Sequence, residues 1–559
     1  MTASSLPDLL RDAAREHPGR AALLLPRGRR HRPGAGGFQV TTYAGLQQRS
    51  DAVAARLVGL GIGPGMRTAL MVPPQLDFFA LSFALLRIGA VPVLIDPGIG
   101  LGNVRRCLAQ VAPEAFVGVP RAHLARRLLR WCPSARLLVT VGRLPGGGPS
   151  LEQLEPGGHP PPPPDPSSTS AIAFTSGSTG PPKGVEYRQP HFLAQIALIR
   201  SLYDVRPGEV SLSTFPPFAL FGPALGLTTV IPRMNPSQPA RVDPARVADA
   251  ANAFGATLMF GSPALLDTVG RWGAVGGARM PTLTRVISAG APVTPAVQRR
   301  LLAMLGPEAE IHSPYGATEA LPVTSIGSRD VLALTDPGIC VGRAVPGVDL
   351  AIVPITDEPV PSTDTFLAEG EVGEIVVRGP NVTTSYADQP AATAAAKTQW
   401  GDRLAHRMGD LGYLDGSGRL WFCGRKAHRV LTAAGPMFTV PCEQVFNAHP
   451  EVFRSALVGV GPPGRQRPVL CVELEPAADP RPALTAELLV LGAGHEHTAA
   501  INTVLFHRGF PVDIRHNAKI DRVALAGWAA RRLRRPRRPS RPRRPRRPRR
   551  PQQWRRSRR

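Results

Sequence analysis

The sequence predicts an α/β fold, with a large N-terminal domain of layered helices and mostly parallel sheets and a small α+β domain after it. Helical and strand-like segments alternate through residues 40–150 and again farther along the chain, which is typical of βαβ units. Beyond Gly424 the alternation gives way to a smaller α+β pattern. The 559 residues are 43% apolar and 19% charged, which supplies a sizeable core and excludes a wholly disordered chain. We therefore place the domains at 1–423 and 424–530, with a tail at 531–559.

The first half of the chain contains the longest apolar stretch, from Phe78 to Ile95. An arginine, a glycine and a proline interrupt it, so it fits a buried helix running into a strand better than a membrane span of ~20 apolar residues. In chain order we expect a helix at Tyr43–Leu60, a strand at Thr68–Val72, a helix at Leu76–Ile88 and a strand at Ala90–Ile95.

A proline-rich stretch at 155–169 interrupts this pattern, and we interpret it as a surface loop because it can hardly form a packed element. After it we expect strands at Ile172–Phe174, Ala256–Phe260 and Val286–Ser288, and helices around His191–Tyr203 and Pro295–Leu305. In the C-terminal domain we expect strands at Ser455–Val460 and Val469–Leu474 and an apolar helix near Val523–Ala530.

Most of the positive charge lies at the C-terminus. The formal net charge is +25, and residues 531–559 contain 17 arginines and no acid. Charge repulsion and prolines predict that this Arg/Pro tail is disordered. It could bind nucleic acid non-specifically, or an anionic membrane surface, through phosphates. We favour the alternative of an extension without function, because its single tryptophan offers little base stacking.

The six cysteines lie far apart, without a CxxC pair or a nearby histidine partner. We expect buried free thiols rather than a metal site or a disulfide framework. The N-terminus has acids early and lacks a continuous apolar segment, so we expect no signal peptide. These features predict a cytoplasmic protein with at most peripheral membrane contact.

A glycine- and hydroxyl-rich turn between two strand-like pieces is the clearest chemical motif. It reads Thr175-Ser-Gly-Ser-Thr-Gly-Pro-Pro-Lys-Gly184. Small residues let the backbone approach an anion closely, while the hydroxyls and Lys183 add donors. No Walker A register fits, and a flexible linker is the alternative. The candidate phosphate-binding residues are Thr175, Ser176, Gly177, Ser178, Thr179, Gly180 and Lys183.

This turn resembles the phosphate loop of the acyl-adenylate-forming superfamily, which includes acyl-CoA synthetases and the adenylation domains of peptide synthetases. The resemblance extends over residues ~40–530 in the family's order. It implies ATP and Mg²⁺ as cofactors and a small, mobile C-terminal domain that closes as a lid. The turn Ser288-Ala-Gly-Ala-Pro292 resembles the adenine-side turn, with Gly290, Ala291 and Pro292 as its binding residues.

Four further positions match the family's motifs. Tyr315-Gly316-Ala-Thr318-Glu319 resembles the motif whose aromatic ring lies on adenine and whose glutamate binds Mg²⁺. Asp410 resembles the carboxylate that binds the ribose hydroxyls, and Arg425 the hinge arginine that reaches ribose or phosphate. Lys519 stands where the family keeps the lysine that completes adenylation. The resemblance implies catalytic roles for Lys183, Thr318, Glu319 and Lys519, and nucleotide contacts for Tyr315, Gly316, Thr318, Asp410 and Arg425.

Taken singly, each residue has an ordinary alternative as a half-buried aromatic, a turn residue or a surface cation. Together, and in the family's order, the motifs from Thr175 to Lys519 favour the functional interpretation. The chemistry is also coherent, because a carboxylate that attacks the α-phosphate of ATP is repelled by it. Mg²⁺ on Glu319, the loop donors and Lys519 would neutralise the charge that develops.

Several stretches resemble one branch of the superfamily, the β-lactone synthetases of bacterial long-chain olefin biosynthesis. These are His191–Ile196, Thr214–Phe221, His406–Tyr413, Leu420–Lys426 and Phe510–Ile520. The resemblance implies adenylation of a long-chain 2-alkyl-3-hydroxy fatty acid, attack by its own hydroxyl and release of AMP, with CoA not required. A tethered nucleophile makes a second bound substrate unnecessary. It also implies possible assembly with other olefin-pathway enzymes.

Three departures bear on the alternatives. Ala219 stands where many acyl-CoA ligases have a histidine, Ala427 where an acid commonly follows the hinge arginine, and Ala518 where a glycine precedes the lysine. They weaken an acyl-CoA or acyl-carrier ligase interpretation, which remains the first alternative. An inactive scaffold or polyanion binder, dominated by the tail, is the second.

A hydrophobic substrate pocket is the last prediction. Phe215, Phe218 and Phe221 are apolar and close to the motifs in sequence, and could line a tunnel for the acyl chain. His191 and His406 could serve the hydroxyl proton. Core packing and structural hydrogen bonds are the alternatives for these residues.

Overall fold

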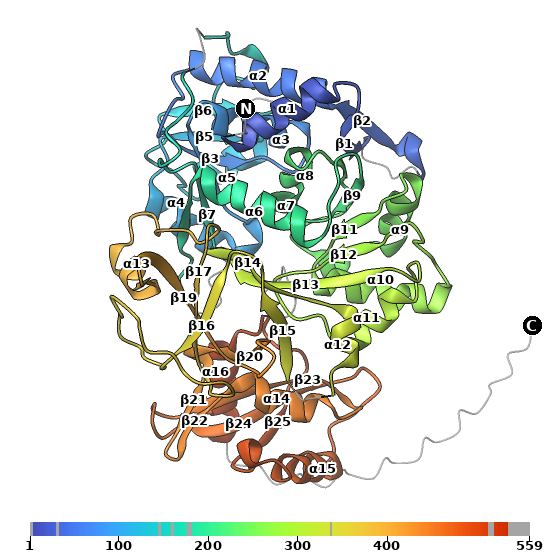
Figure 1. Cartoon of the computed structure of the whole chain (residues 1–559), viewed down its shortest axis with the longest axis vertical. Helices are drawn as coiled ribbons and strands as arrows, with labels where there is room; N and C mark the ends of the chain where they lie inside the picture. Colours follow the sequence, from blue (N-terminus) through green and yellow to red (C-terminus); the bar gives the residue numbers. More distant parts are fainter. Residues whose placement is uncertain are drawn as a thin grey trace, which may run out of the picture.

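In the part of the chain that the structure describes, four β-sheets and the helices that cover them form the fold, as seen in a computed structural model (Figure 1). The structure describes residues 4–28, 33–142, 147–157, 161–175, 181–335, 338–512 and 519–534. In Figure 1 the chain runs from an N-terminal part at the top to C-terminal sheets at the bottom.

A six-stranded sheet forms the N-terminal α/β layer. Its order is β6-β5-β3-β4-β7-β8, parallel except for the edge strand β8. The strands are β3 (Arg67–Met71), β4 (Val91–Leu94), β5 (Ala115–Gly118), β6 (Leu137–Thr140), β7 (Ala171–Phe174) and β8 (Gly184–Tyr187). Helices α2 (Tyr43–Gly59) and α3 (Leu76–Arg87) pack on one face, and α4 (Leu101–Val111) and α5 (Pro120–Leu128) on the other. Helix α3 is buried on nearly every side, which explains its apolar sequence.

A 14-stranded sheet forms the middle of the molecule. It is parallel from β1 to β13 in the order β1-β10-β9-β11-β12-β13 and antiparallel onward through β14, β15, β20, β19, β17 and β16. Its parallel part and edge contain β1 (Ala21–Pro26), β2 (Phe38–Thr42), β9 (Val210–Ser213), β10 (Thr228–Val230), β11 (Leu258–Phe260), β12 (Arg285–Ile287) and β13 (Glu310–Ala317). The antiparallel part contains β14 (Ala320–Gly327), β15 (Ile339–Ala344), β16 (Asp349–Val353), β17 (Gly373–Arg378), β18 (Lys397–Trp400), β19 (Arg403–Leu414) and β20 (Leu420–Arg425).

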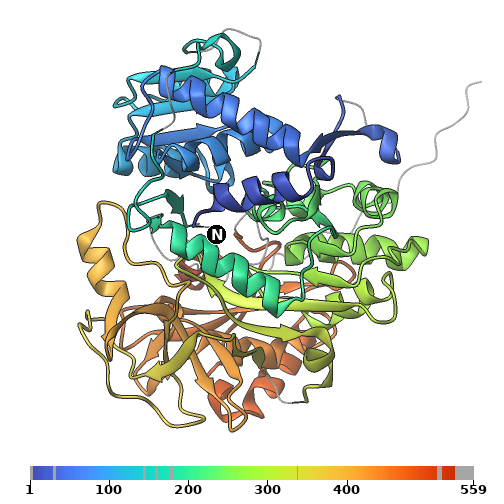
Figure 2. The ribbon, with the colours of Figure 1, turned by 45° about the horizontal axis from the view of Figure 1, so that its top comes forward.

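Helices pack around the large sheet. Helix α6 lies between the six-stranded sheet and the antiparallel strands, as Figures 1 and 2 both show. The helices of this region are α1 (Leu6–Glu16), α6 (Gln189–Leu202), α7 (Pro216–Ala219), α8 (Phe221–Ala224), α9 (Pro244–Ala253), α10 (Pro263–Gly276), α11 (Pro295–Leu302), α12 (Ser328–Ala333) and α13 (Pro390–Ala396).

Two small sheets form the C-terminal part. One is the hairpin of β21 (Val430–Thr432) and β22 (Gly435–Met437). The other contains β23 (Val452–Val460), β24 (Arg467–Leu474) and β25 (Val504–Phe506). Helices α14 (Thr439–Asn447) and α15 (Pro482–Ala493) cover one face of the three-stranded sheet, and α16 (Arg522–Arg534) covers the other.

The structure confirms most of the predicted elements, and every predicted helix and strand is present near its expected position. Residues 155–157 and 161–169 contain no helix or strand, in agreement with the predicted loop. The antiparallel half of the large sheet was not foreseen. Helix α16 continues to Arg534, four residues into the predicted tail, and the rest of the tail lies outside the described residues.

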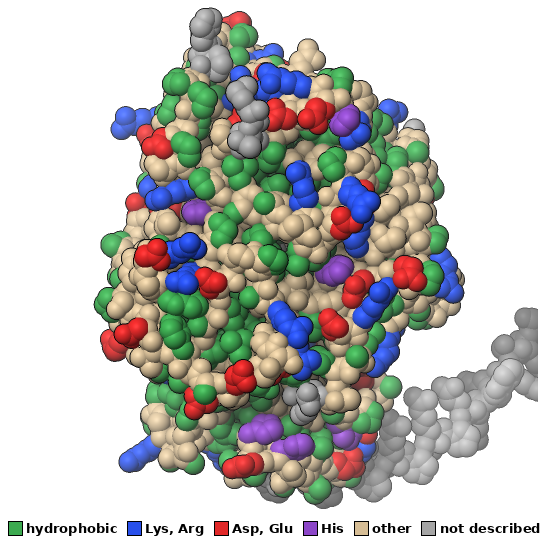
Figure 3. Space-filling view, in the orientation of Figure 1, with side chains coloured by type: hydrophobic (Ala, Val, Ile, Leu, Met, Phe, Trp, Pro, Cys, Tyr) green, Lys and Arg blue, Asp and Glu red, His purple; other side chains and the backbone are tan. Residues whose placement is uncertain are grey.

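All six cysteines are buried free thiols, as predicted. Within the described ranges, no helix combines the length and the apolar character that a membrane span needs. On the face seen in Figure 3, basic and acidic side chains are interspersed rather than gathered by sign. The excess charge in the sequence is therefore not matched by a basic patch on that face.

Candidate active site

The predicted phosphate turn joins β7 to β8 at the edge of the six-stranded sheet. Its base is closed by two hydrogen bonds: the Thr175 amide donates to the Lys183 carbonyl at 3.0 Å, and the Lys183 amide donates to Thr175 Oγ1 at 3.2 Å. The ammonium of Lys183 lies 4.9 Å from the centre of the Tyr386 ring. The predicted residues Ser176, Gly177, Ser178, Thr179 and Gly180 lie outside the described part of the chain.

A hydrogen bond connects this hairpin to the predicted adenine motif. The hydroxyl of Tyr187, at the end of β8, donates to the backbone carbonyl of Thr318. The motif occupies the tight turn between β13 and β14, where the register shifts between Tyr315 and Ala317. A Cβ at Gly316 would lie 2.5 Å from the Ala320 carbonyl oxygen, so the turn requires glycine there. The two motifs, distant in sequence, are therefore adjacent.

Asp410 links two other predicted site residues in the large sheet, Tyr315 and Arg425. The Tyr315 hydroxyl donates to Asp410 Oδ2 at 2.7 Å, and Arg425 Nε lies 2.9 Å from Asp410 Oδ1. Asp410 and Arg425 face each other across the β19–β20 ladder. Burial raises the pKa of Asp410, and the charge of Arg425 opposes that shift. Burial also raises the pKa of Tyr315 well above its usual value, so its hydroxyl stays protonated.

Glu319 is buried and held by its neighbours. The Tyr386 hydroxyl donates to Glu319 Oε1 at 2.6 Å. The Thr383 amide and Thr383 Oγ1 both donate to the Glu319 carbonyl, at 2.9 and 3.1 Å. Within the described residues, Glu319 Oε2 accepts no hydrogen bond, so it remains available to a ligand. Tyr386 connects Glu319 to Lys183 and therefore to the phosphate turn.

Lys397 is a buried cation beside these residues that the sequence did not reveal. Its side chain donates to the Thr383 carbonyl, and it faces His406 across the β18–β19 ladder. Burial lowers the pKa of Lys397 to about 7, while the charge of Glu319 acts in the opposite direction. Burial, followed by the charge of Lys397, lowers the pKa of His406 well below its usual value. The histidine is therefore neutral, and its Nδ1 contacts the Ala396 carbonyl at 3.0 Å.

The free energy of unfolding is expected to rise with pH because of Lys397. Its pKa in the folded protein is about 7, below the ~10.4 of an exposed lysine. Between these values the unfolded chain binds a proton that the folded chain does not, so raising the pH favours folding by up to about 1.4 kcal/mol per pH unit. Lys397→Met should remove this dependence. Denaturant titrations of both proteins between about pH 6.5 and 9 measure it, and identical pH slopes would contradict it.

The predicted adenine-side turn follows β12. The Ser288 amide donates to the His312 carbonyl at 2.9 Å, which fixes the turn beside β13, the strand that contains Tyr315. Gly290 has a φ of +96°, a conformation that favours glycine. Gly290 and Pro292 are exposed and Ala291 is half-buried, so the turn presents its backbone at the surface.

Lys519 comes from the C-terminal part of the chain and is electrostatically close to Asp410. Burial raises the pKa of Asp410, and the positive charge of Lys519 opposes this rise, after the larger opposing effects of Arg425 and Tyr315. Residues 513–518 lie outside the described part. Arg522 is not directed at the site, because its guanidinium pairs with buried Glu443, Nη2 lying 2.9 Å from Oε2.

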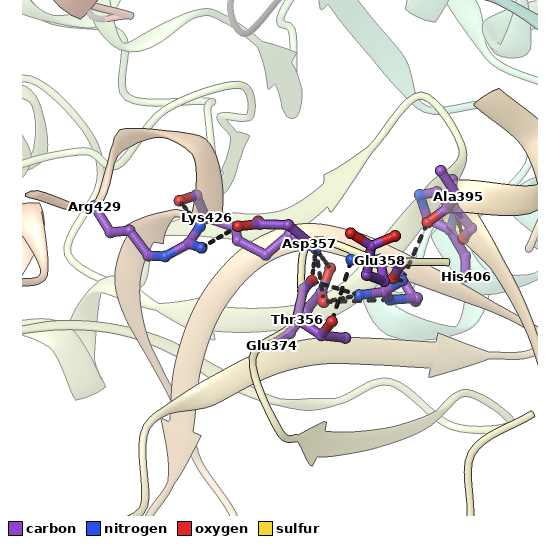
Figure 4. A network of polar contacts seen from close by, with 10 residues as sticks. Thr356, Asp357, Glu358, Glu374, Ala395, His406, Lys426 and Arg429 are labelled. Atoms are coloured by element: carbon purple, nitrogen blue, oxygen red, sulfur yellow. Dashed lines mark hydrogen bonds and ion pairs between the residues drawn. The ribbon is translucent and has the colours of Figure 1, made fainter. Parts of the chain in front are cut away.

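A buried polar network includes Lys426, the residue that follows Arg425 in sequence (Figure 4). Lys426 Nζ is 2.9 Å from both carboxylate oxygens of Glu374, and Arg407 Nη2 is 2.6 Å from Oε2. Glu374 and Arg407 are 1% and 2% exposed at their side chains. Arg429 pairs with Asp357 at the rim of the network. The first residues after β20 are therefore attached to the large sheet by ion pairs.

The predicted pocket residues form an aromatic cluster. Phe218 stacks on Phe260 at 4.3 Å between ring centres, and Phe221 contacts Phe218 edge-on at 6.3 Å. Phe215 stacks on Phe260 at 5.8 Å. The three predicted rings are only partly buried, and they pack against the main N-terminal core.

A groove of about 980 Å³ lies elsewhere, between α1, α2 and residues 161–164.

His191 has a structural contact. Its Nδ1 accepts the Arg188 amide at 3.1 Å at the start of α6. Burial lowers the pKa of His191 to about 4, and the charges of Arg188 and Lys397 add to that shift. The cluster of phenylalanines is linked to the adenine motif through Phe192, which stacks on Tyr187 at 4.9 Å.

The arrangement fits a nucleotide. Two buried atoms at the site, Asp410 Oδ1 and Ser288 Oγ, have no hydrogen-bond partner within the described structure, although the former is ion-paired with Arg425. Buried polar atoms are ordinarily hydrogen-bonded, so these two suit ligand groups. Lys183 and Arg425 supply positive charge, and Glu319 supplies a carboxylate oxygen of the kind that Mg²⁺ prefers. Among described residues, no group of three or more His, Cys, Asp or Glu side chains forms a metal cluster.

Comparisons with known proteins concern the chain as a whole. A family model described as AMP-binding enzyme matches residues 10–387. The chain is 50% identical over 553 residues to the olefin beta-lactone synthetase of Xanthomonas campestris pv. campestris, covering 95% of this chain and 97% of that protein. It is 49% identical to the protein of the same name from Stenotrophomonas maltophilia, covering 95% and 98%.

A solved structure confirms the predicted fold class. The amide bond synthetase McbA from Marinactinospora thermotolerans superposes with a TM-score of 0.76 at 24% identity, covering 94% of this chain and 99% of that one.

Proposed function

The chain belongs to the family of AMP-binding enzymes, and from that premise we propose that it converts a long-chain 2-alkyl-3-hydroxy fatty acid to a β-lactone at the expense of ATP. The observation that supports this most is the near-full-length match to two olefin beta-lactone synthetases. In the first step the substrate carboxylate attacks the α-phosphorus of ATP and pyrophosphate leaves. In the second, the 3-hydroxyl attacks the acyl carbon, its proton is lost, and the bond to AMP breaks.

The residues at the site are assigned as follows. The turn at 175–184 would bind the phosphates, with Lys183 adding charge. Asp410 would accept the ribose hydroxyls, because it is an oriented, buried carboxylate with one oxygen that accepts no hydrogen bond. Tyr315, fixed by Asp410, would present its ring to adenine. Gly290, Ala291 and Pro292 would border that ring.

Charge stabilisation is assigned to groups that surround the phosphates. Glu319 would bind Mg²⁺, which supplies positive charge that screens the phosphates from the attacking carboxylate. Lys519 would add a second positive charge from the C-terminal side, and its field already reaches Asp410. The Thr318 carbonyl is occupied by Tyr187, which leaves the Thr318 hydroxyl as its contribution.

The division into domains 1–423 and 424–530 is part of the proposal. It is supported by the change of sheet after β20, which ends at Arg425 in the large sheet, while β21 begins another. Lys519 then belongs to the smaller unit, and closure of that unit would bring it to the site. We assign the phenylalanine cluster and His191 to the acyl chain. The cluster is partly exposed, and Phe192 links it to Tyr187 beside the adenine motif.

Product formation without CoA is expected and tests the proposal. The enzyme, ATP, Mg²⁺ and a 2-alkyl-3-hydroxy acid should give AMP and a β-lactone in comparable amounts, because the attacking hydroxyl is already tethered. Added CoA should not accelerate the reaction. AMP release and mass spectrometry of the organic product measure both outcomes.

The matched 2-alkyl acid without the hydroxyl is the control, and it should be adenylated without forming a lactone. If AMP appears only after CoA is added, with a thioester as the product, the acyl-CoA ligase alternative replaces the proposal.

We place the reaction in the cytoplasm, since six free thiols suit a reducing compartment. Assembly with other enzymes of an olefin pathway follows from the proposed product, which a further enzyme must consume.

A further inference from the structure

The segment 382–387 connects the two halves of the site. Its Ala387 amide donates to the Gly184 carbonyl at 2.8 Å, next to Lys183. The Glu186 amide donates to the Ser385 carbonyl at 3.1 Å, so this segment runs beside β8. At its other end Thr383 donates twice to the Glu319 carbonyl. A displacement of this segment would therefore move the phosphate turn and the Glu319 turn together.

Lys397 anchors that segment from behind. Its ammonium donates to the Thr383 carbonyl, while the Thr383 amide and hydroxyl face Glu319. Thr383 is fully buried and Lys397 is 6% exposed. Thr383 is thus held from two sides: its amide and hydroxyl donate to the Glu319 carbonyl, and its own carbonyl accepts from the buried side chain of Lys397.

Protonation of Lys397 at this buried position is costly, which agrees with its lowered pKa. Within the described residues, no carboxylate lies within ion-pair distance of Lys397, and its only hydrogen-bond acceptor is a backbone carbonyl. Transfer of an ammonium from water into a protein interior is strongly unfavourable unless a charge partner compensates it. The nearest compensation is the field of Glu319, which acts on Lys397 without direct contact. An apolar side chain of similar size would be less costly for folding alone.

We propose that Lys397 is a positioning residue for the proposed reaction, holding Thr383 and segment 382–387 so that Glu319 and Lys183 keep their places around the phosphates. The inference rests on the proposed function. It assigns Lys397 no contact with substrate, and its effect passes through Thr383. The charge of Glu319 in turn favours the protonated form of Lys397.

The test compares Lys397→Met, which keeps the length of the side chain, with Lys397→Arg, which keeps a charge and donors. ATP–pyrophosphate exchange is measured with a 2-alkyl-3-hydroxy acid while Mg²⁺ is varied. Lys397→Met should lower kcat and raise the Mg²⁺ concentration that gives the half-maximal rate. The ratio of kcat to that concentration should fall by about 10-fold or more, as it does when other groups that orient a metal ligand are removed. Its melting temperature should not fall, and Lys397→Arg should recover part of the exchange. Gln399→Met, on an exposed position of the same strand, is the matched control and should behave as wild type.

Unchanged kcat and unchanged Mg²⁺ dependence in Lys397→Met would overturn the inference. Equal impairment of both Lys397 variants, accompanied by equally lowered melting temperatures, would also overturn it, because the side chain would then serve the fold alone. Failure of the proposed function looks different, since wild type itself would show no exchange. In that case the rise in melting temperature caused by Mg²⁺ and ATP still tests the inference: it should be smaller in Lys397→Met than in wild type, and an equal rise would overturn it.

Discussion

Replacing Lys519 by alanine should lower the rate of adenylation by about 10²–10³-fold, the usual loss when one preorganised charge or donor is removed from a developing anion. ATP binding should change little, because the residues assigned to ribose and adenine, Asp410 and Tyr315, lie in the large sheet. The charge of Lys519 already acts on Asp410, which supports its assignment to the site. ATP–pyrophosphate exchange measures the rate, and the melting-temperature rise caused by ATP measures binding.

Two comparisons sharpen this expectation. Lys519→Arg keeps the charge and should retain more activity than alanine. Arg522→Lys changes a nearby cation that pairs with Glu443 rather than facing the site. This substitution should lower the melting temperature, if anything, and leave the rate of ATP–pyrophosphate exchange close to that of wild type. Exchange by Lys519→Ala at the wild-type rate would remove Lys519 from the mechanism.

Replacing Glu374 by alanine should destabilise the protein by about 3–5 kcal/mol, because it leaves buried Arg407 and Lys426 without their shared carboxylate. Glu374 is almost inaccessible to water, so solvent cannot replace the lost partner. Denaturant unfolding followed by intrinsic fluorescence measures the change.

The matched control for this change is Asp357→Asn, which removes an ion pair at the exposed rim of the same network. Asp357 is 66% exposed, and its loss should cost less than about 1 kcal/mol. Equal effects of the two substitutions would show that burial of Glu374 does not determine its contribution.

The sequence was sufficient to predict site residues and helices where the signal lies in one short run of residues. The turn at 175–184, the residues 315–319 and the pair Gly409-Asp410 are short runs with their own chemistry, and helices such as α3 have a hydrophobic pattern of their own. The prediction that these motifs converge depended on the family resemblance. Tyr187, an ordinary tyrosine in the sequence, makes the physical link to Thr318.

The sequence was insufficient to predict residues whose role depends on tertiary contacts. Thr383, Tyr386 and Lys397 lie in no recognisable motif, and only folding brings them to Glu319. The Glu374–Arg407 and Glu374–Lys426 pairs join residues 33 and 52 positions apart. Antiparallel pairing in the large sheet was also hidden, because a strand such as β17 is buried on both faces and lacks the apolar–polar alternation that is common in antiparallel strands. At the C-terminus, α16 extends to Arg534, beyond position 531 where the tail was predicted to begin.

Arg425 is both the last residue of β20 and the ladder partner of Asp410. A displacement of Arg425 would act on Asp410 directly through their ion pair, and on Tyr315 through the hydrogen bond that the Tyr315 hydroxyl donates to Asp410. The ion pairs of Lys426 with Glu374 and of Arg429 with Asp357 oppose such a displacement, so the orientation of the Tyr315 ring depends on how firmly these next residues are held.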